Sequence, residues 1–366
     1  MAIKIGIVGL PNVGKSTFFN AITDSNIEAA NYPFATINPN IKVIDVEDNR
    51  AYKLKDIYDS KKIVFTQVSF YDIAGLVKNA SKGEGLGNKF LANIREVDLI
   101  LQIVRLFNEK DIIHVNNKID PIEDINTINL ELIISDLEQI EKWLTKNKKK
   151  IEAEKKRLDE LTLILRIKKS LEDEINLRDL KFKEEEKDFL KQFNFLTLKP
   201  IIYLANISED NLINPNKDLN YQKYLAYINK NNLDSILISA RIENEINKIS
   251  SYQEKEQFLN EYNLKERGIN LILNKIFKLL KLGTFFTCGK EEIHLWKFKL
   301  GINAKKAAGI IHSDFEKGFI KAEVFSYTDL IKYQKEDILK EKGLIRIEGK
   351  DYQIKDGDIV HFRFNL

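Results

Sequence analysis

The residues of most chemical interest lie near the start of the chain, where positions 9–16 read GLPNVGKS. This stretch satisfies the pattern G-x-x-x-x-G-K-[ST], and it follows the apolar IKIGIV and precedes the helical STFFNAI, as the pattern requires. Gly9 and Gly14 let the backbone curl so that successive N–H groups face a phosphate, and the following helix adds its positive end. Lys15 can reach the β- and γ-phosphates, and Ser16 can ligate Mg²⁺. The spacing predicts a P-loop.

Two further segments supply candidate groups for the metal ion. Asp72 ends the strand-like segment in YDIAG, as the aspartate of a Walker B element does, and would hold Mg²⁺ through water. Thr36, in NYPFATINPN, lies between the two motifs. A loop threonine there can complete the Mg²⁺ shell around a triphosphate, although it is also compatible with an ordinary loop residue. The predicted metal ligands are therefore Ser16, Thr36 and Asp72.

The group that would activate water is not the glutamine found in Ras-like hydrolases. Leu76 stands directly after the D-x-A-G motif, where Ras-like hydrolases carry a glutamine that orients the attacking water. Leucine cannot hydrogen-bond water, so turnover is expected to be slow or to need another group. His114 in NEKDIIHV is the nearest candidate, because an imidazole can position water or accept its proton. The alternative is a histidine with no catalytic role, and Lys15 remains the predicted source of charge stabilisation.

Two tetrapeptides compete for the role of the base-reading loop, NKID at 117–120 and NISE at 206–209. In a P-loop GTPase this loop follows a buried strand that comes one strand–helix unit after the Walker B strand. NISE meets this requirement, since it ends KPIIYLAN and is followed further on by the Ser239–Ala240 turn of ISARIE. NKID has no helix between it and the strand DLILQIVRLF, and no Ser-Ala turn follows it at a suitable distance. We therefore predict that 206–209 faces the base.

The composition of NISE favours adenine. The aspartate of N-K-x-D accepts hydrogen bonds from guanine N1–H and its 2-amino group, and the lysine stem covers the base. Here the lysine is replaced by Ile207 and the aspartate by Glu209, a longer and therefore displaced carboxylate. A site rejects a base only through well-placed polar groups, so disturbing the carboxylate should abolish the preference for GTP. ATP becomes the predicted substrate.

The length, composition and net charge of the chain limit the class of protein. The 366 residues are enough for two or three domains, and the net charge of +3 implies no strongly basic surface, although a local basic patch for RNA is compatible with it. The single cysteine excludes an intramolecular disulfide and fits a reducing cytoplasm. No apolar run is long enough to span a bilayer, and the N-terminus does not read as a signal peptide.

Three patterns divide the chain. Residues 1–130 and 197–282 alternate apolar strands with helices, which predicts a parallel α/β sheet. Residues 131–196 contain no Gly or Pro, and their apolar residues recur at helical spacing. They predict two long antiparallel helices, either a solvated pair or a partner-binding arm. Residues 283–366 predict a small α+β domain of four strands and one helix.

The motifs GLPNVGKSTFFNAIT, NYPFATINPN, DIAGLVKNASKGEGLGNKFLANIREVD, YLANISE and ISARIENE, with the C-terminal AAGIIHSDFEKGFIKAEV, closely resemble the Obg-like ATPase, or YchF, family over essentially the full chain. The resemblance implies a P-loop domain interrupted by a helical coiled-coil insertion, and a C-terminal TGS domain of ubiquitin-like, β-grasp fold. It also implies hydrolysis of ATP in preference to GTP and association with the ribosome, through its large subunit, and with RNA. Such a protein would act as a nucleotide-dependent switch in translation or stress response.

The resemblance also assigns individual residues. It implies an adenine site at Asn206 and Ile207, Mg²⁺ at Ser16 and Thr36, and a role for His114 in hydrolysis. The residues that it places against the phosphates are Asn12, Val13, Gly14, Lys15, Ser16 and Thr17. A K⁺ ion beside the phosphates is compatible with an oxygen from Asn12. Two other functions stay open at this stage, a GTPase in which Glu209 still reads guanine and a scaffold that binds nucleotide without hydrolysing it.

Overall fold

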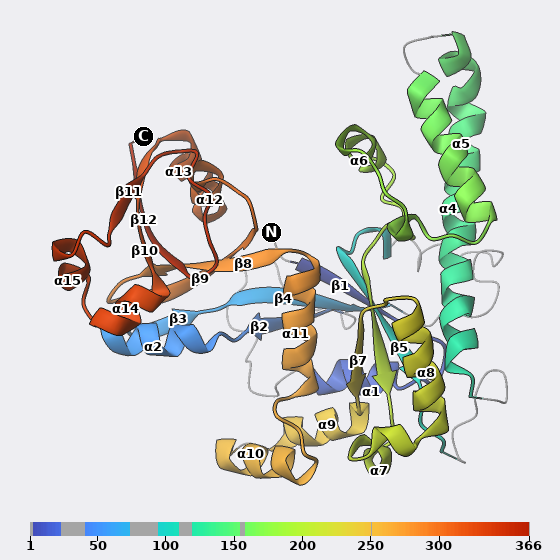
Figure 1. Ribbon diagram of the computed structural model, residues 1–366, viewed down its shortest axis with the longest axis horizontal. Helices are drawn as coiled ribbons and strands as arrows, with labels where there is room; N and C mark the ends of the chain where they lie inside the picture. The colour runs from blue at the N-terminus through green and yellow to red at the C-terminus, as the bar shows by residue number, and fades with distance from the viewer. Residues whose placement is uncertain are drawn as a thin grey trace. The chain divides into compact units, whose positions relative to one another are not determined.

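The computed structural model describes residues 3–22, 41–73, 94–109, 119–153, 158–249 and 251–365. The chain forms two compact units (Figure 1). The first comprises Met1–Ile44 and Ser69–Ile272, and the second comprises Asp45–Val68 and Leu273–Leu366. Residues 45–68, which the sequence patterns grouped with the nucleotide-binding region, thus belong to the same unit as the C-terminal segment. The predicted domain boundaries at 131, 197 and 283 stay predictions.

The first unit is built on a six-stranded sheet in the order β2-β4-β1-β5-β6-β7. The pairs β1–β5, β5–β6 and β6–β7 are parallel. All seven residues of β5 are buried, as expected for a central strand covered on both faces. The strands are β1 (Ile3–Val8), β2 (Ile41–Val46), β4 (Thr66–Asp72), β5 (Leu99–Arg105), β6 (Ile201–Asn206) and β7 (Ser235–Ile238). The predicted parallel α/β sheet is confirmed.

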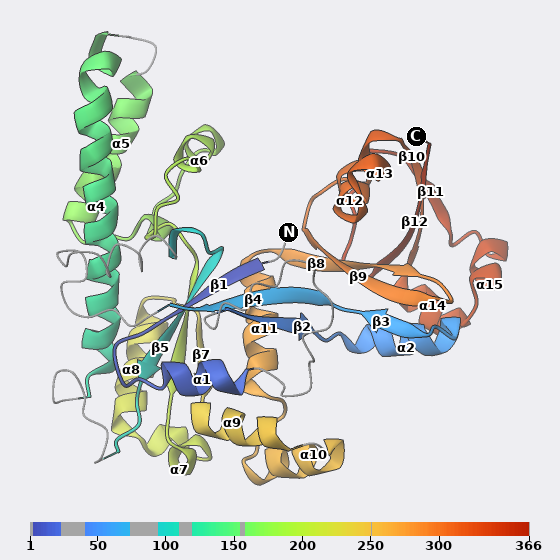
Figure 2. The ribbon, with the colours of Figure 1, turned by 180° about the vertical axis from the view of Figure 1, so that it is seen from behind.

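The carboxyl ends of the neighbouring parallel strands β1, β5, β6 and β7 come to one edge of the sheet (Figure 2). Helix α1 follows β1 directly, and α9 follows β7 directly. The helices of this part of the chain, apart from the insertion, are α1 (Lys15–Ala21), α7 (Glu209–Leu212), η3 (Pro215–Lys217), α8 (Leu219–Lys230), α9 (Ala240–Lys248), α10 (Tyr252–Glu261) and α11 (Gly268–Leu279).

The predicted helical insertion forms a pair of long helices that lie side by side in Figures 1 and 2, α4 (Pro121–Ala153) and α5 (Leu158–Glu172). Their apolar stripes meet in one core, which includes Ile140 of α4 and Ile164 of α5. Helix α4 begins ten residues earlier than the apolar pattern indicated, because Pro121 suits a first helical position and Asp120 accepts a hydrogen bond from Glu123 N at 3.2 Å.

The end of the insertion differs from the prediction. The charged stretch LRDLKFKEEEKDFLKQF is not part of a long helix but forms two short helices, η2 (Leu177–Asp179) and α6 (Glu184–Leu190). An extended residue, Lys183, precedes α6 and breaks the helical path. Phe193 and Phe195 then stack with a centroid distance of 4.9 Å and close the core between α4 and α5. This segment therefore packs against the helical pair through its apolar and aromatic residues.

The second unit contains a six-stranded sheet in the order β11-β10-β12-β8-β9-β3. Successive residues of β8 face opposite sides, so Phe285 packs in the core with α12 and Phe286 packs in the core with α2. The strands are β3 (Lys62–Val64), β8 (Leu282–Cys288), β9 (Glu292–Lys299), β10 (Phe319–Ser326), β11 (Arg346–Glu348) and β12 (Asp358–Phe364). The helices are α2 (Asn49–Tyr58), α12 (Ala304–Ile311), α13 (Ser313–Lys317), α14 (Tyr327–Tyr333) and α15 (Glu336–Glu341).

The expectation of four strands and one helix in the C-terminal segment was wrong. Strand β8 and helices α14 and α15 were missed, and the stretch read as one helix is two, separated by the extended residue His312. The missed helices have seven and six residues, too few for a periodic apolar pattern to be recognised. The presence of a C-terminal α+β domain is confirmed, and its assignment as a ubiquitin-like TGS domain stays a prediction.

Residues 45–68 are held in the second unit by an arginine and by α2. Arg50 lies between two carboxylates, with Nη2 2.7 Å from Asp48 Oδ2 and Nη1 2.8 Å from Asp356 Oδ2. Ala51 and Leu54 are fully buried in the core that contains Phe286. Because these contacts join positions far apart in the chain, the sequence pattern could not show them.

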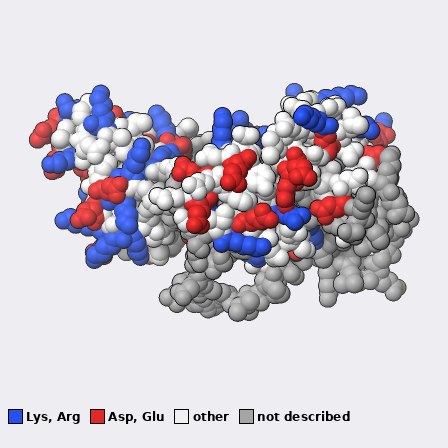
Figure 3. Space-filling view, turned by 90° about the horizontal axis from the view of Figure 1, so that it is seen from below, with Lys and Arg blue, Asp and Glu red and all other residues white. Residues whose placement is uncertain are grey.

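Charged residues of both signs are interspersed on the face drawn in Figure 3, in keeping with the near-neutral composition. Within the described residues, no helix has the length and apolar character needed to cross a membrane.

Candidate nucleotide-binding site

The predicted phosphate loop joins β1 to α1 and has a strained backbone. Gly14 has φ of +91° and Asn12 has φ of +62°, both in the left-handed region. A Cβ on Gly14 would lie 2.3 Å from Asn206 Nδ2, and one on Gly9 would lie 3.0 Å from the Ile103 carbonyl oxygen. Both glycines are therefore required by close approach, and Gly14 is required by its backbone conformation as well.

Lys15 connects this loop to the end of β4. Its Nζ lies 3.0 Å from Asp72 Oδ1 and donates to the Ile73 carbonyl oxygen at 2.7 Å. The two motifs that the sequence analysis assigned to phosphate and to metal therefore meet in space. The neighbouring Ser16 and Thr17 side chains are exposed. A cation and a carboxylate at this separation can serve a phosphate and a divalent metal ion respectively.

A second lysine near Asp72 was not found from the sequence. Lys42, in β2, lies with its Nζ 4.8 Å from the centroid of the Phe19 ring. Burial lowers the pKa of Lys42, and the negative charge of Asp72 opposes that shift. No motif surrounds Lys42, so nothing in the sequence distinguished it from other strand lysines.

Asn206 joins three elements at the predicted base-reading loop. It ends β6, is 3% exposed, donates through Nδ2 to the Val13 carbonyl oxygen at 2.9 Å and accepts through Oδ1 from Ala240 N at 2.9 Å. A carboxamide carries its donor and its acceptor on two separate atoms of one short side chain, so it can bridge two backbone groups at once. The side chain thus ties the phosphate loop to the turn at Ser239–Ala240.

The other residues predicted to surround the base have defined positions in the structure. Ile207 is buried, and its backbone N donates to the Ile238 carbonyl oxygen at 2.9 Å. The Ser239 side chain accepts from Ile242 N at the start of α9. The predicted members Asn206, Ile207, Ser239 and Ala240 therefore lie at the carboxyl ends of the adjacent strands β6 and β7, at the same sheet edge as the phosphate loop.

Glu209 has a partner that the sequence analysis missed. Its Oε1 lies 2.7 Å from Nε of Arg241, the residue after the Ser239–Ala240 turn. Arg241 is 66% exposed and Glu209 is 26% exposed, so this is a surface ion pair of small energy. The carboxylate at the position of the guanine-reading aspartate therefore carries an internal counter-charge.

Several predicted residues lie outside the described part of the chain, namely Thr36, His114, Leu76, Asn117 and Lys118. Of the competing tetrapeptide NKID, the structure describes Ile119 and Asp120, which lead into α4. The roles of all these residues stay predictions.

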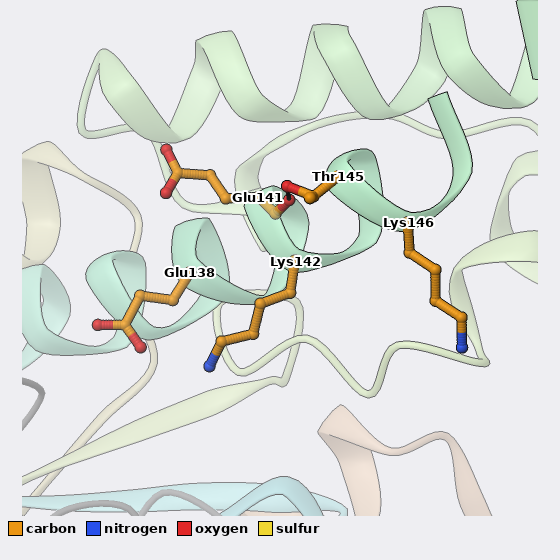
Figure 4. Close-up of a pocket in the computed structure, with 5 residues that line it drawn as sticks. All are labelled: Glu138, Glu141, Lys142, Thr145 and Lys146. Atoms are coloured by element: carbon orange, nitrogen blue, oxygen red, sulfur yellow. Dashed lines mark hydrogen bonds between the residues drawn. The ribbon is translucent and has the colours of Figure 1, made fainter. Parts of the chain in front are cut away.

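Among the described residues, neither a metal-binding cluster nor the hollow on α4 offers a competing site. Within the described residues, no group of three or more His, Cys, Asp and Glu side chains could hold a metal ion. The shallow hollow in Figure 4 is lined by side chains that project from α4 alone. Thr145 there donates to the Glu141 carbonyl oxygen of its own helix at 2.8 Å. Nothing in this hollow brings chemically distinct groups from different elements together.

A parallel sheet with a G-x-x-x-x-G-K-S loop after its first strand, and an asparagine and a Ser-Ala turn beside that loop, defines a P-loop nucleotide-binding protein. Two family models match the chain, and the first agrees with this class. One, described as 50S ribosome-binding GTPase, matches residues 4–156. The other, the YchF-GTPase C-terminal family, described as a protein of unknown function, matches residues 282–365.

Full-length relatives specify the family. The chain is 47% identical to the ribosome-binding ATPase YchF of Bacillus subtilis over 367 residues, which cover 100% of both chains. It is 45% identical to the protein of the same name from Mycoplasma genitalium, again with 100% of both chains covered. The solved structure of the Schizosaccharomyces pombe YchF GTPase matches with a TM-score of 0.87 and 36% identity, over 99% of this chain and 97% of that one. The chain belongs to the YchF family.

Proposed function

We propose that this protein is a ribosome-associated, Mg²⁺-dependent ATPase that binds ATP in preference to GTP and slowly hydrolyses it to ADP and phosphate. The observation that carries the proposal is the bonding of Asn206 to both Val13 and Ala240, beside an intact phosphate loop. The full-length relatives are named as ATPases, which supports the choice of nucleotide.

The base-side residues support a preference for adenine. Ile207 stands where a lysine stem would cover guanine, and it is buried. Glu209 Oε1 is paired with Arg241 Nε at 2.7 Å, so this oxygen already faces a cation and is less available to guanine N–H groups. Adenine has an unprotonated N1 and no 2-amino group, so it needs no such carboxylate. Asn206, Ile207, Glu209, Ser239 and Ala240 would surround the base.

On the phosphate side, the loop residues 12–17 would contact the phosphates. The ion pair of Lys15 and Asp72 suits an exchange of partners, because a bound Mg²⁺–triphosphate supplies an anion for Lys15 and a cation for Asp72. Both charges then remain paired during binding. Mg²⁺ prefers a few protein oxygens together with phosphate oxygens and water, which fits the hydroxyl of Ser16, the carboxylate of Asp72 and the proposed Thr36.

In the proposed reaction a water oxygen forms a bond to the γ-phosphorus, the bond from that phosphorus to the β-phosphate oxygen breaks, and ADP, phosphate and a proton leave. Lys15 would stabilise the charge that develops on the phosphoryl oxygens. With Leu76 in place of a glutamine, His114 is the proposed group that orients water, and slow turnover is expected. K⁺ beside Asn12 would add a further positive charge.

Ribosome association is proposed from the names of the relatives, and contact with the large subunit from the family model described as 50S ribosome-binding GTPase. The helical insertion and the C-terminal domain are the proposed contact surfaces for the ribosome and for RNA. A nucleotide-dependent switch in translation or stress response, acting in the cytoplasm, is the role that these properties support.

Calorimetric titration of the purified chain with Mg²⁺–ATP and Mg²⁺–GTP tests the nucleotide choice. We expect ATP to bind at least about tenfold more tightly, which corresponds to about 1.4 kcal/mol. Equal affinities or tighter GTP binding would overturn the adenine assignment. Phosphate release measured with and without ribosomes then separates an ATPase from a scaffold that binds nucleotide without turnover.

A further inference from the structure

Arg105 is a buried cation that the phosphate and base motifs do not explain. It is the last residue of β5 and is only 1% exposed, although it carries a guanidinium group. Its Nε donates to the Phe107 carbonyl oxygen at 3.1 Å, and its Cζ lies 4.4 Å from the centroid of the Phe107 ring. Burying a charge is costly unless the group is hydrogen-bonded and paired, so such a residue indicates a specific task.

The guanidinium also reaches the phosphate loop. Nη1 of Arg105 donates to the Asn12 carbonyl oxygen at 3.4 Å. In the β5–β6 register Arg105 is paired with Asn206, whose side chain donates to the next carbonyl oxygen of the loop, that of Val13, at 2.9 Å. Two adjacent parallel strands thus end in side chains that hold two successive carbonyl groups of the same loop.

The geometry of the peptide bond gives this arrangement a consequence. In a trans peptide the C=O and the following N–H point in opposite directions. When Arg105 holds the Asn12 carbonyl, the N–H of Val13 is directed away from Arg105. When Asn206 holds the Val13 carbonyl, the N–H of Gly14 is likewise directed away from β6. Successive N–H groups oriented in this way form the concave anion-binding arrangement called a nest.

We infer that Arg105 is a positioning residue of the phosphate site, which fixes the Asn12–Val13 peptide so that the Val13 N–H is available to a polyphosphate. The inference rests on the proposed nucleotide binding. Arg105 acts through the backbone of Asn12. Its role differs from that of Lys15, whose ammonium group would touch the phosphates.

The alternative is that Arg105 has a purely structural role, and the test must distinguish this role from positioning of the phosphate loop. Burial lowers the pKa of Arg105, and the negative charges of Glu109 and of Asp124 in α4 oppose that shift, so the guanidinium also balances acidic groups. Arginine stays protonated throughout the pH range in which proteins fold, so both roles would persist at every working pH. Stability alone therefore cannot distinguish them, and nucleotide affinity must be measured with it.

The test compares Arg105→Met, Arg105→Lys and a matched control, Arg178→Met, in the full chain. Arg178 donates to Asn129 Oδ1 at 2.7 Å and lies at the base of the helical insertion. Titration with Mg²⁺–ADP and Mg²⁺–ATP should show a loss of about tenfold or more in both affinities for Arg105→Met, the scale of one lost charge-assisted hydrogen bond. Arg105→Lys should recover part of the loss. Lysine keeps the positive charge but lacks the planar guanidinium that reaches both the Asn12 and the Phe107 carbonyl oxygens.

Amide NMR resonances of Val13 and Gly14 provide the readout that a structural role would leave unchanged. They should shift in both Arg105 variants and stay in place in Arg178→Met, whose nucleotide affinities should match the wild type. If Arg105→Met does not fold, Arg105→Lys decides the question, since it retains the charge beside the acidic groups.

The outcomes separate the two proposals. If the wild-type chain binds neither nucleotide, the proposed function fails, and this inference fails with it. If the wild type binds but the folded Arg105 variants bind equally well with unchanged Val13 and Gly14 signals, only the inference is overturned. An equal loss in Arg178→Met would also overturn it, because the loss would then follow from general destabilisation.

Discussion

The phosphate side and the base side of the site are built differently. On the phosphate side, buried polar side chains hold the loop, with Arg105 on the Asn12 carbonyl and Asn206 on the Val13 carbonyl. On the base side, the one charged group of the N-x-x-E tetrapeptide is held by Arg241, which is 66% exposed. Hydrogen bonds are worth more where water is excluded, whereas surface ion pairs contribute little. The protein should therefore bind polyphosphate firmly and choose between bases less strictly.

The substitution with the largest expected effect is Lys15→Met. It removes the charge proposed to stabilise the reacting phosphoryl group and leaves Asp72 without its 3.0 Å partner. We expect phosphate release to fall by at least about a hundredfold, the scale seen when one preorganised donor is removed. The control is Lys4→Met, whose ammonium pairs at 3.5 Å with the exposed Glu96. A Lys15 variant with normal turnover would contradict the assignment of the phosphate side.

Gly14→Ala should come next. Alanine at φ of +91° is strained by about 1–2 kcal/mol, and its Cβ would also lie 2.3 Å from Asn206 Nδ2. We expect thermal stability and ATP affinity to fall together, the affinity by at least about tenfold. Gly349→Ala is the control, since a Cβ there meets nothing within 4 Å. If Gly14→Ala kept full affinity, the loop would be far more adaptable than its hydrogen bonds imply.

Asn206→Ala should have an intermediate effect. It leaves the Val13 carbonyl and the Ala240 N–H without their buried partner, at a cost of about 1–3 kcal/mol each. Differential scanning calorimetry should show a lower Tm, and ATP should bind about tenfold more weakly. Asn211→Ala, which removes a 2.7 Å hydrogen bond to Asp218 away from the loop, should leave nucleotide affinity unchanged. An unaltered Tm in Asn206→Ala would show that these two hydrogen bonds stabilise the protein less than their distances and burial imply.

Arg241→Ala should have the smallest effect. Because its partnership with Glu209 is a surface ion pair, releasing the carboxylate should shift the ratio of ATP to GTP affinity toward GTP by only about two- to threefold. Parallel titrations of Glu209→Ala, which lacks the carboxylate, should show no such shift. A change beyond about tenfold in Arg241→Ala would show that the base side is as firmly built as the phosphate side.

Local patterns were sufficient for much of the fold. The near-continuous apolar run of β5 predicted a buried strand, because a strand covered on both faces has no polar side to expose. The helical spacing of α4 and α5 predicted their pairing, while the first turn of α4 depended on Pro121 and Asp120, which carry no apolar signal. The short α14 and α15 could not be recognised from periodicity.

Part of the candidate site could likewise be predicted from local patterns, and part of it could not. The glycine spacing of residues 9–16 is a local property, so the loop could be predicted without any knowledge of its neighbours. The choice of 206–209 over 117–120 also followed from spacing along the chain. The partners Arg105 and Arg241 could not be found in this way, since an arginine at a strand end or after a turn is common and usually solvated.

The sequence by itself determined a parallel α/β protein with a P-loop, a long helical pair and a C-terminal α+β domain, because each depends on residue types at short, regular spacing. Only the tertiary structure decided that Asn206 holds Val13, that Lys15 meets Asp72 and that residues 45–68 join the C-terminal unit. These contacts join residues that are distant along the chain. Chain folding brings them together, and short-range patterns of hydrophobicity and turn residues carry no record of such pairs.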